Sequence, residues 1–299
     1  MALDQSQPTC SKYRLVVFYS NRNFCLFLAS PVNHKESMEV LSYVPTRLHP
    51  TTPIVQAVYH HPLLITLSAS FDLTIYELPS TESDGISPQI RLTQTLTSFT
   101  SYPPTSLILS NPLPATYKLV LAYSVPIYPS HWTVAVTELT VSAFTVQSTQ
   151  TTSAFDLNPG WSPLTYTLSE SLGDQYARKL SQVSSTSTDG KYVVLAGAAT
   201  NTIQLYRLSS RSRTAGPKLT FLRTLHGHVS PVQALYVADG RCVSLARDGT
   251  LWVWDLECGE VEVDSEGLGK LPETAKVLFD ERRILIVLDG GIVLRRFDM

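Results

Sequence analysis

Residues 225–256, LHGHVSPVQALYVADGRCVSLARDGTLWVWDL, contain the pattern that decides the fold of this 299-residue chain. Three short runs rich in Val, Leu, Tyr and Trp are separated by the turns Ala238-Asp239-Gly240 and Asp248-Gly249-Thr250. Runs of this composition with Asp-Gly between them are typical of antiparallel strands joined by tight hairpins. The stretch therefore predicts three consecutive strands of one antiparallel sheet.

Weaker copies of the last run lie in three other places. They are residues 73–78 and 201–208, which align with it without gaps, and residues 289–298, which repeat the turn and end in Phe-Asp. Tyr76 and Tyr206 then take the place of Trp254. A repeat of about 40–45 residues with four short strands is typical of a propeller blade.

The strongest repeat resembles the WD40 repeat, because Gly227-His228, three strands, an Asp-Gly turn and Trp254-Asp255 follow one another in that family's order. The resemblance implies an all-β fold, a WD40-like β-propeller of about six to seven four-stranded blades. Six units can be placed, at roughly 13–44, 53–98, 103–149, 179–225, 231–264 and 274–298. The first lacks an obvious inner strand and the last lacks an outer one. We therefore expect a fragment, or a propeller that is incomplete at the N-terminus.

The composition of the chain suggests an N-terminal segment, a propeller region and two insertions within that region. Residues 1–12 are expected to form a disordered or polar N-terminal segment, and residues 13–299 the propeller. Insertions are expected near 79–90 and at 148–178, the second of which is rich in Ser and Thr. In a propeller the second insertion would join two blades, on the rim where partners commonly dock in this family.

Charge and cysteine content limit the function classes. The net charge is −2, so we expect neither nucleic acid nor anionic membrane as a partner. The four cysteines form no Cys-x-x-Cys pair, and we expect no metal and no cofactor. We also see no signal peptide and no apolar run of membrane-spanning length, which favours the cytoplasm or the nucleus.

Four residues of the strongest repeat could form a polar cluster: His228, Ser244, Asp248 and Trp254. A Ser, His and Asp together suggest a nucleophilic triad, and the alternative function is a hydrolase-type enzyme on a propeller. A triad of that kind needs an exposed nucleophile turn, whereas Ser244 lies inside a predicted strand. The family resemblance implies a structural network instead, in which Asp248 accepts from His228, His228 meets Ser244, and Ser244 meets the Trp254 indole. We therefore expect no catalytic residue and no enzyme activity.

The resemblance also implies the kind of function. WD40 propellers are mostly scaffolds or recognition modules, so the expected partners are other proteins, with no small-molecule substrate. The degenerate repeats and long Ser/Thr/Pro loops are also similar to those of fungal F-box proteins with a WD40 domain. In those proteins the propeller selects substrates for a ubiquitin ligase.

Loops on one rim are the expected partner site. The segments 125–131 and 148–178 should share a rim, because each either links the two middle strands of a blade or joins two blades. Aromatic residues and cations in such loops are typical of protein-binding patches. The candidate residues are Tyr128, His131, Trp161, Arg178, Lys179 and Arg247.

Overall fold

The computed structural model describes most of the chain. The described residues are 1–6, 12–20, 23–30, 37–45, 52–79, 89–98, 101–113, 115–127, 131–154, 183–209, 216–259, 261–264, 268–272, 274–280 and 282–296. Every helix or strand element among them is a β-strand, which confirms the all-β prediction. No helix long and apolar enough to cross a membrane occurs in this part of the chain.

The chain divides into two compact units. The first comprises Met1–Thr100, Leu109–Leu119 and Leu139–Thr149, and the second comprises Ser101–Ile108, Val120–Glu138 and Gln150–Met299. The described strands form six antiparallel sheets, five with four strands and one with three. Six sheets agree with the expected number of blades, and the three-stranded sheet is the last, as the sequence predicted.

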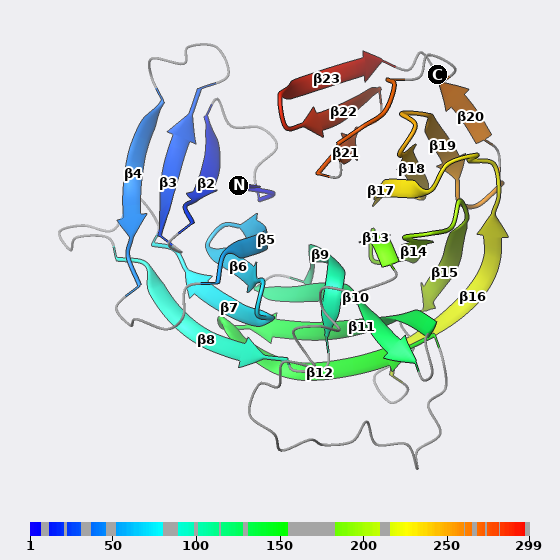
Figure 1. The fold of residues 1–299 in the computed structure, drawn as a ribbon. Coiled ribbons are helices and arrows are strands. Elements are labelled where there is room, and N and C mark those ends of the chain that lie inside the picture. The colour runs from blue at the N-terminus through cyan, green and yellow to red at the C-terminus, as the bar shows by residue number, and fades with distance from the viewer. Residues whose placement is uncertain are drawn as a thin grey trace. The chain divides into compact units, whose positions relative to one another are not determined.

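The first unit contains two sheets (Figure 1). One is formed by β1 (Ala2–Leu3), β2 (Tyr13–Phe18), β3 (Phe24–Ala29) and β4 (Met38–Tyr43), and the other by β5 (Ile54–His60), β6 (Leu63–Ser68), β7 (Asp72–Glu77) and β8 (Arg91–Thr97). Phe24 and Leu26 of the first sheet are buried with Tyr59 and Leu64 of the second. The alternation of apolar and polar residues therefore gives each sheet a face that packs on its neighbour.

The first strand of the first sheet lies where the sequence gave no strand signal. Ala2 pairs with Val16 and Leu3 with Leu15, so residues 2–3 depart from the expected disordered or polar segment. The Asp4 carboxylate fixes this strand, because its Oδ1 accepts the His61 amide N–H at 2.9 Å. Residues 7–11 lie outside the described part of the chain.

The third sheet has the order β12-β11-β10-β9. Its strands are β9 (Tyr102–Leu113), β10 (Thr116–Ile127), β11 (His131–Ser142) and β12 (Thr145–Ser153). Because β12 runs to Ser153, the expected insertion at 148–178 begins later than predicted, and residues 148–153 are strand. Residues 148–153 show no alternation of apolar and polar side chains that would predict a strand, because β12 is an edge strand whose side chains are mostly exposed and polar. The remainder of this insertion and most of the one near 79–90 lie outside the described residues.

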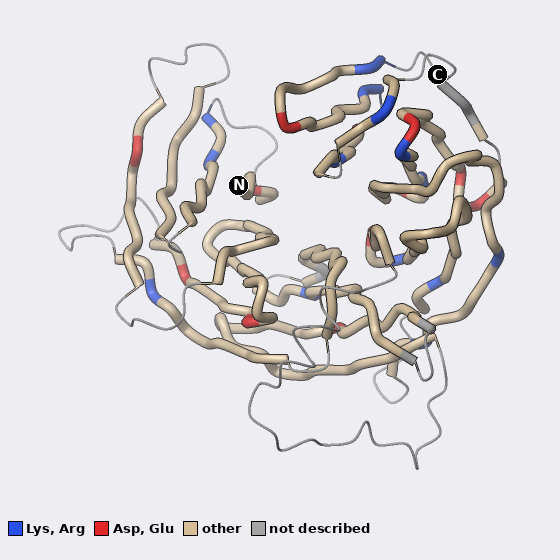
Figure 2. Tube along the Cα trace, in the orientation of Figure 1, with Lys and Arg blue, Asp and Glu red and all other residues tan. Residues whose placement is uncertain are grey.

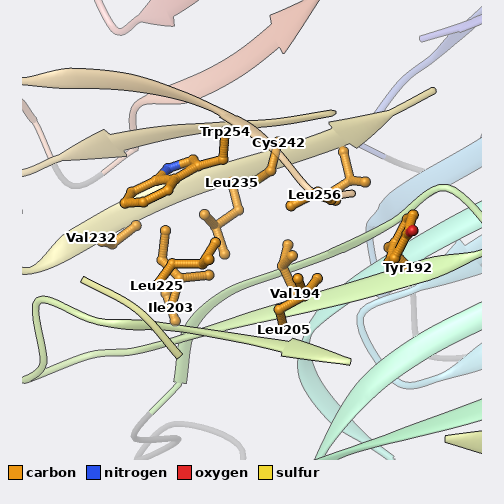
Figure 3. Packing of buried hydrophobic residues seen from close by; sticks show 12 residues of the cluster. Tyr192, Val194, Ile203, Leu205, Leu225, Val232, Leu235, Cys242, Trp254 and Leu256 are labelled. Carbon is orange, nitrogen blue, oxygen red and sulfur yellow. The ribbon is translucent and has the colours of Figure 1, made fainter. Parts of the chain in front are cut away.

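Three sheets follow in the second unit (Figure 1). They are β13 (Val183–Thr188), β14 (Tyr192–Gly197), β15 (Ile203–Ser209) and β16 (Lys218–Leu225); β17 (Val232–Ala238), β18 (Arg241–Ala246), β19 (Leu251–Asp255) and β20 (Val261–Asp264); and β21 (Lys276–Phe279), β22 (Arg283–Leu288) and β23 (Gly291–Arg296). The first strands of successive sheets contact one another, β13 with β17 and β17 with β21. Ile203 and Leu205 of β15 pack with Leu235 and Trp254 between two of these sheets (Figure 3).

Serine hydroxyls join β13 to β17. Ser185 Oγ accepts the Leu235 amide N–H at 3.0 Å, and Ser187 Oγ accepts the Val237 N–H at 2.9 Å. Ser184 Oγ donates to the Val232 carbonyl at 2.6 Å. Strand β13 is therefore polar in sequence but mostly buried, because its hydroxyls satisfy backbone groups of the neighbouring sheet.

Candidate functional site

The four expected network residues lie together at the end of the sheet β17–β20. Trp254 Nε1 donates to Ser244 Oγ at 2.7 Å, and Ser244 Oγ lies 2.7 Å from His228 Nε2. The expected direct contact of Asp248 with His228 is not present, and Thr250 lies between them instead. Its Oγ1 is 3.3 Å from His228 Nδ1 and donates to Asp248 Oδ1 at 2.7 Å. The Asp248 carboxylate also accepts the Thr250 amide N–H at 3.0 Å, so it closes its own turn rather than reaching the imidazole.

The chemistry of the end groups sets the direction of every proton in this chain. An indole N–H can only donate and an ionised carboxylate can only accept. Ser244 therefore accepts from Trp254 and donates to His228 Nε2, while His228 Nδ1–H donates to Thr250 and the Thr250 hydroxyl donates to Asp248. This order satisfies each group once and requires a neutral His228 protonated on Nδ1.

Burial keeps His228 neutral. The residue is 3% exposed, and this burial lowers the pKa of its imidazole to about 4, against the weaker opposing effect of the Asp248 charge. Ser244 is fully buried and its hydroxyl bonds both His228 and Trp254. It cannot meet a substrate in the folded protein, which argues against the nucleophilic triad.

Acidification should therefore destabilise the protein through His228. Below pH 6.5 the unfolded chain binds a proton on this imidazole, whereas the folded chain does so only near pH 4. The free energy of unfolding should fall between these two values as the pH is lowered, by up to about 3 kcal/mol from this group. Urea unfolding of the wild type and of His228→Gln across this range measures the effect. The unfolding free energy of the variant should depend less steeply on pH than that of the wild type, and equal dependence would contradict the assignment to His228. Burial also lowers the pKa of His61, but this residue contributes equally to both proteins.

The network holds two loops in place. One is residues 226–231, which contains His228, and the other is residues 247–250, between β18 and β19. Gly227 lies directly against the Trp252 indole, since a Cβ at this position would come within 1.9 Å of that ring. Trp252 in turn stacks on Trp254, with ring centroids 5.1 Å apart. The Gly-His pair is therefore required for close packing of the first loop on β19.

A shallow hollow lies beside these loops. It is lined by Ser184, Ala198, Pro231, Val232, Gln233 and Arg247. The strand registers bring these segments to one end of the two sheets, because Val183 pairs with Gly197 and Val232 pairs with Ala246. The hollow therefore lies among strand starts and middle-strand turns of these two sheets, and Arg247 is the predicted partner residue that lines it.

Arg247 is the charged residue of this hollow. Its backbone is held on both sides, since its N–H donates to the Pro231 carbonyl at 2.9 Å and its carbonyl accepts the Leu271 N–H at 3.1 Å. Its side chain is exposed. Val229, in the neighbouring loop, is 91% exposed. A cation and an apolar side chain are thus presented from rigid loops.

The other expected partner residues are not described at side-chain level. Tyr128, Trp161, Arg178 and Lys179 lie outside the described residues, and His131 is described only as the first residue of β11. Five residues of the hollow were not predicted from the sequence: Ser184, Ala198, Pro231, Val232 and Gln233. Small and aliphatic side chains carry no functional pattern of their own, so no motif could identify these residues. The one sequence signal among them was Pro231, which marks the start of a strand.

Metal-binding potential is absent from the described residues, where no three His, Cys, Asp or Glu side chains gather in a suitable group. Cys25, Cys242 and Cys258 are free thiols. Burial raises the pKa of the Cys242 thiol well above its usual value, so this cysteine is a small hydrophobic core residue.

The comparisons with known proteins agree with this geometry. A family model described as the F-box protein pof12 β-propeller matches residues 1–284. Among solved structures, Hsv2p of Kluyveromyces lactis has a TM-score of 0.52 and 10% identity, with 99% of this chain and 73% of that one covered. Sqt1 of Saccharomyces cerevisiae has a TM-score of 0.50 and 9% identity, with 94% and 80% covered. Both structures are WD40 propellers, and at these identities they show the fold alone. A search of the curated proteins finds no match to this sequence.

Proposed function

Since this chain belongs to the β-propeller family of the F-box protein pof12 and has the WD40 propeller fold, which typically serves protein interaction, we propose that it is a non-catalytic module that recognises other proteins. We place its main partner site on the rim that carries Arg247 and Val229. We further propose that the module selects substrates for a ubiquitin ligase, as the F-box name of the family suggests.

The observation that carries this proposal is an exposed cation, Arg247, on a loop that hydrogen bonds hold at both its backbone and its neighbouring side chains. The loops 226–231 and 247–250 are joined by the chain of hydrogen bonds from Trp254 to Asp248, which is buried at Ser244 and partly buried at Thr250. A rigid scaffold that presents variable loops is the usual arrangement of a recognition surface, because little conformational entropy is lost on binding.

The lining of the hollow suggests the chemistry of the partner. The Arg247 guanidinium offers several N–H donors in one plane, which fit a carboxylate or phosphate group. Ala198, Pro231 and Val232 beside it are small or aliphatic and suit an apolar side chain. We therefore expect an extended, acidic segment of the partner to lie over this rim.

Replacement of Arg247 by alanine should weaken partner binding without unfolding the protein. Removing one charge-assisted contact at the centre of an interface costs on the order of 2 kcal/mol, or about thirtyfold in affinity. The test is affinity purification from the source cell with wild type, Arg247→Ala and Trp161→Ala, read by mass spectrometry. Arg207→Ala is the matched control, because Arg207 is an exposed arginine in the middle of a β-sheet strand. Equal recovery of all partners by the wild type and by the Arg247→Ala and Trp161→Ala variants would contradict the proposal.

The ligase role needs a separate measurement. A partner lost from the Arg247→Ala purification should accumulate in cells that express only this variant, and its ubiquitination should fall. Unchanged abundance and ubiquitination of that partner would refute the ligase role while leaving the recognition role intact.

A further inference from the structure

Among the described residues, one edge of the sheet β21–β23 has no pairing strand. In the sheets β5–β8 and β17–β20 the third strand is paired on both sides, β7 with β6 and β8, and β19 with β18 and β20. Among the described residues β23 pairs with β22 alone (Figure 1). An edge strand leaves alternate backbone N–H and C=O groups unpaired, so it can accept a further strand.

The apolar side chains at the centre of β23 are of the kind found in strands that a neighbouring strand covers. By strand register Ile292 corresponds to Leu73 of β7, and Leu294 corresponds to Ile75. Leu73 is 5% exposed and Ile75 is fully buried, whereas Ile292 is 66% exposed and Leu294 is 50% exposed. Edge strands usually carry charges or proline along their length, which prevents unwanted pairing. The centre of β23 has no such protection.

Charges at the end of β23 indicate what kind of strand would pair with it. Glu77, the last residue of β7, pairs in register with Arg91 of β8, and their side chains form an ion pair at 3.7 Å. Arg296 holds the corresponding place on β23, and it lies directly opposite Arg283 of β22. Figure 2 shows the cations of this sheet. Like charges opposite each other are unfavourable, and a carboxylate on the next strand would relieve them.

Two sources of that strand within the protein itself are disfavoured. The N-terminal strand β1 is already paired with β2, and the Asp4 carboxylate holds it there through His61 and Arg14. A second copy that paired through its own β23 would bring Gly-Ile-Val-Leu-Arg-Arg, which contains no carboxylate.

We propose that β23 docks, by antiparallel strand addition, an extended segment of a partner protein. This segment carries a carboxylate opposite Arg296 and an apolar residue opposite Ile292. The pairing of β7 with β8 gives the spacing, because Arg91 lies opposite Glu77 and Leu96 lies opposite Leu73. This site is separate from the rim around Arg247 and does not depend on the function proposed for it.

Two peptides test the proposal. One has the β8 sequence Arg-Leu-Thr-Gln-Thr-Leu-Thr of residues 91–97 with flanking neutral residues, and the other differs only by Glu at its first position. Binding to the full chain is followed by NMR titration and by amide hydrogen exchange. The Glu peptide should bind about three- to tenfold more tightly than the Arg peptide, the range expected for exchanging a like-charge for an opposite-charge cross-strand pair. It should also slow exchange within residues 291–296.

Charge reversal provides the matched control. The Arg296→Glu variant, at an exposed strand end, should bind the Arg peptide more tightly than the Glu peptide. Arg247→Ala should bind both peptides as the wild type does, so failure of the rim site and failure of this site are distinguishable.

Several results would overturn the proposal. They are equal binding of both peptides, no binding of either, and peptide-induced protection elsewhere in the chain. Amides of β23 that exchange as slowly as those of β19 in the free monomer would show that the edge is already covered. Concentration-dependent association that protects β23 would show that a second copy is the occupant.

Discussion

Replacement of Trp254 by alanine should lower the free energy of unfolding by about 3–5 kcal/mol, the range for deletion of a large aromatic residue from a core. Trp254 is 3% exposed and packs between two sheets with Ile203, Leu205 and Leu235. Its loss also leaves Ser244 without its indole donor at the start of the buried network. Equilibrium urea unfolding measures the change.

Tyr206 supplies the comparison within the same protein. It stands at the same repeat position and is 6% exposed, and its hydroxyl bonds the exposed Gln204 and the Thr133 side chain, whereas the Trp254 indole donates to the fully buried Ser244. Tyr206→Ala should therefore cost less than Trp254→Ala. Two phenylalanine variants, which keep an aromatic ring but remove the polar group, separate packing from hydrogen bonding. Trp254→Phe should lower the free energy of unfolding by on the order of 1–3 kcal/mol more than Tyr206→Phe does. A Trp254→Ala protein with nearly wild-type stability would contradict the network.

Replacement of Gly249 by alanine should be comparably severe, at about 3–5 kcal/mol, because two penalties act together. The backbone of Gly249 has φ +86°, a conformation that alanine adopts only with strain. A Cβ would also come within 2.3 Å of the Gly269 carbonyl oxygen and 2.8 Å of the Gly269 nitrogen. These are backbone atoms, so no side-chain rotation can relieve the clash.

Gly240 is the matched control for this substitution. It has φ +75° in the hairpin between β17 and β18, and a Cβ there would meet nothing within 4 Å. Gly240→Ala should therefore show the conformational strain alone, about 1 kcal/mol. Thermal and urea unfolding of the two variants give the difference, and equal losses of stability would show that the contact with Gly269 does not resist displacement.

Much of the strongest repeat could be predicted from its sequence. Strands β17, β18 and β19 lie where the apolar runs placed them, with turns at Asp239-Gly240 and Asp248-Gly249. The contacts of His228, Ser244 and Trp254 could also be anticipated, because the resemblance of this stretch to the WD40 repeat implied them. Local pattern suffices where neighbours in sequence are neighbours in space.

The same repeat shows where local pattern fails. Asp248 could have bonded His228 directly, but its carboxylate closes the turn with Thr250 instead. Residue types alone cannot decide between these partners, because the choice depends on distances set by the packed loop. Strand β13 is a different case: its serines and threonines give no apolar strand signal, and only the adjoining backbone of β17 gives the Ser185 and Ser187 hydroxyls their partners.

The sequence by itself determined that the chain is built from repeated antiparallel sheets and that the last described sheet lacks an outer strand. Its resemblance to the WD40 repeat implied the Trp–Ser–His chain of hydrogen bonds. The tertiary structure alone decided that Ala2–Leu3 completes the first sheet and that Arg247 lines a shallow hollow of mixed polar and apolar side chains. It also decided that Ile292 and Leu294 are exposed on a strand that, among the described residues, pairs on one side alone. The physical reason is the range of the interactions. Turns and strands follow from preferences within a few residues, whereas an edge or a hollow depends on which distant segment covers it.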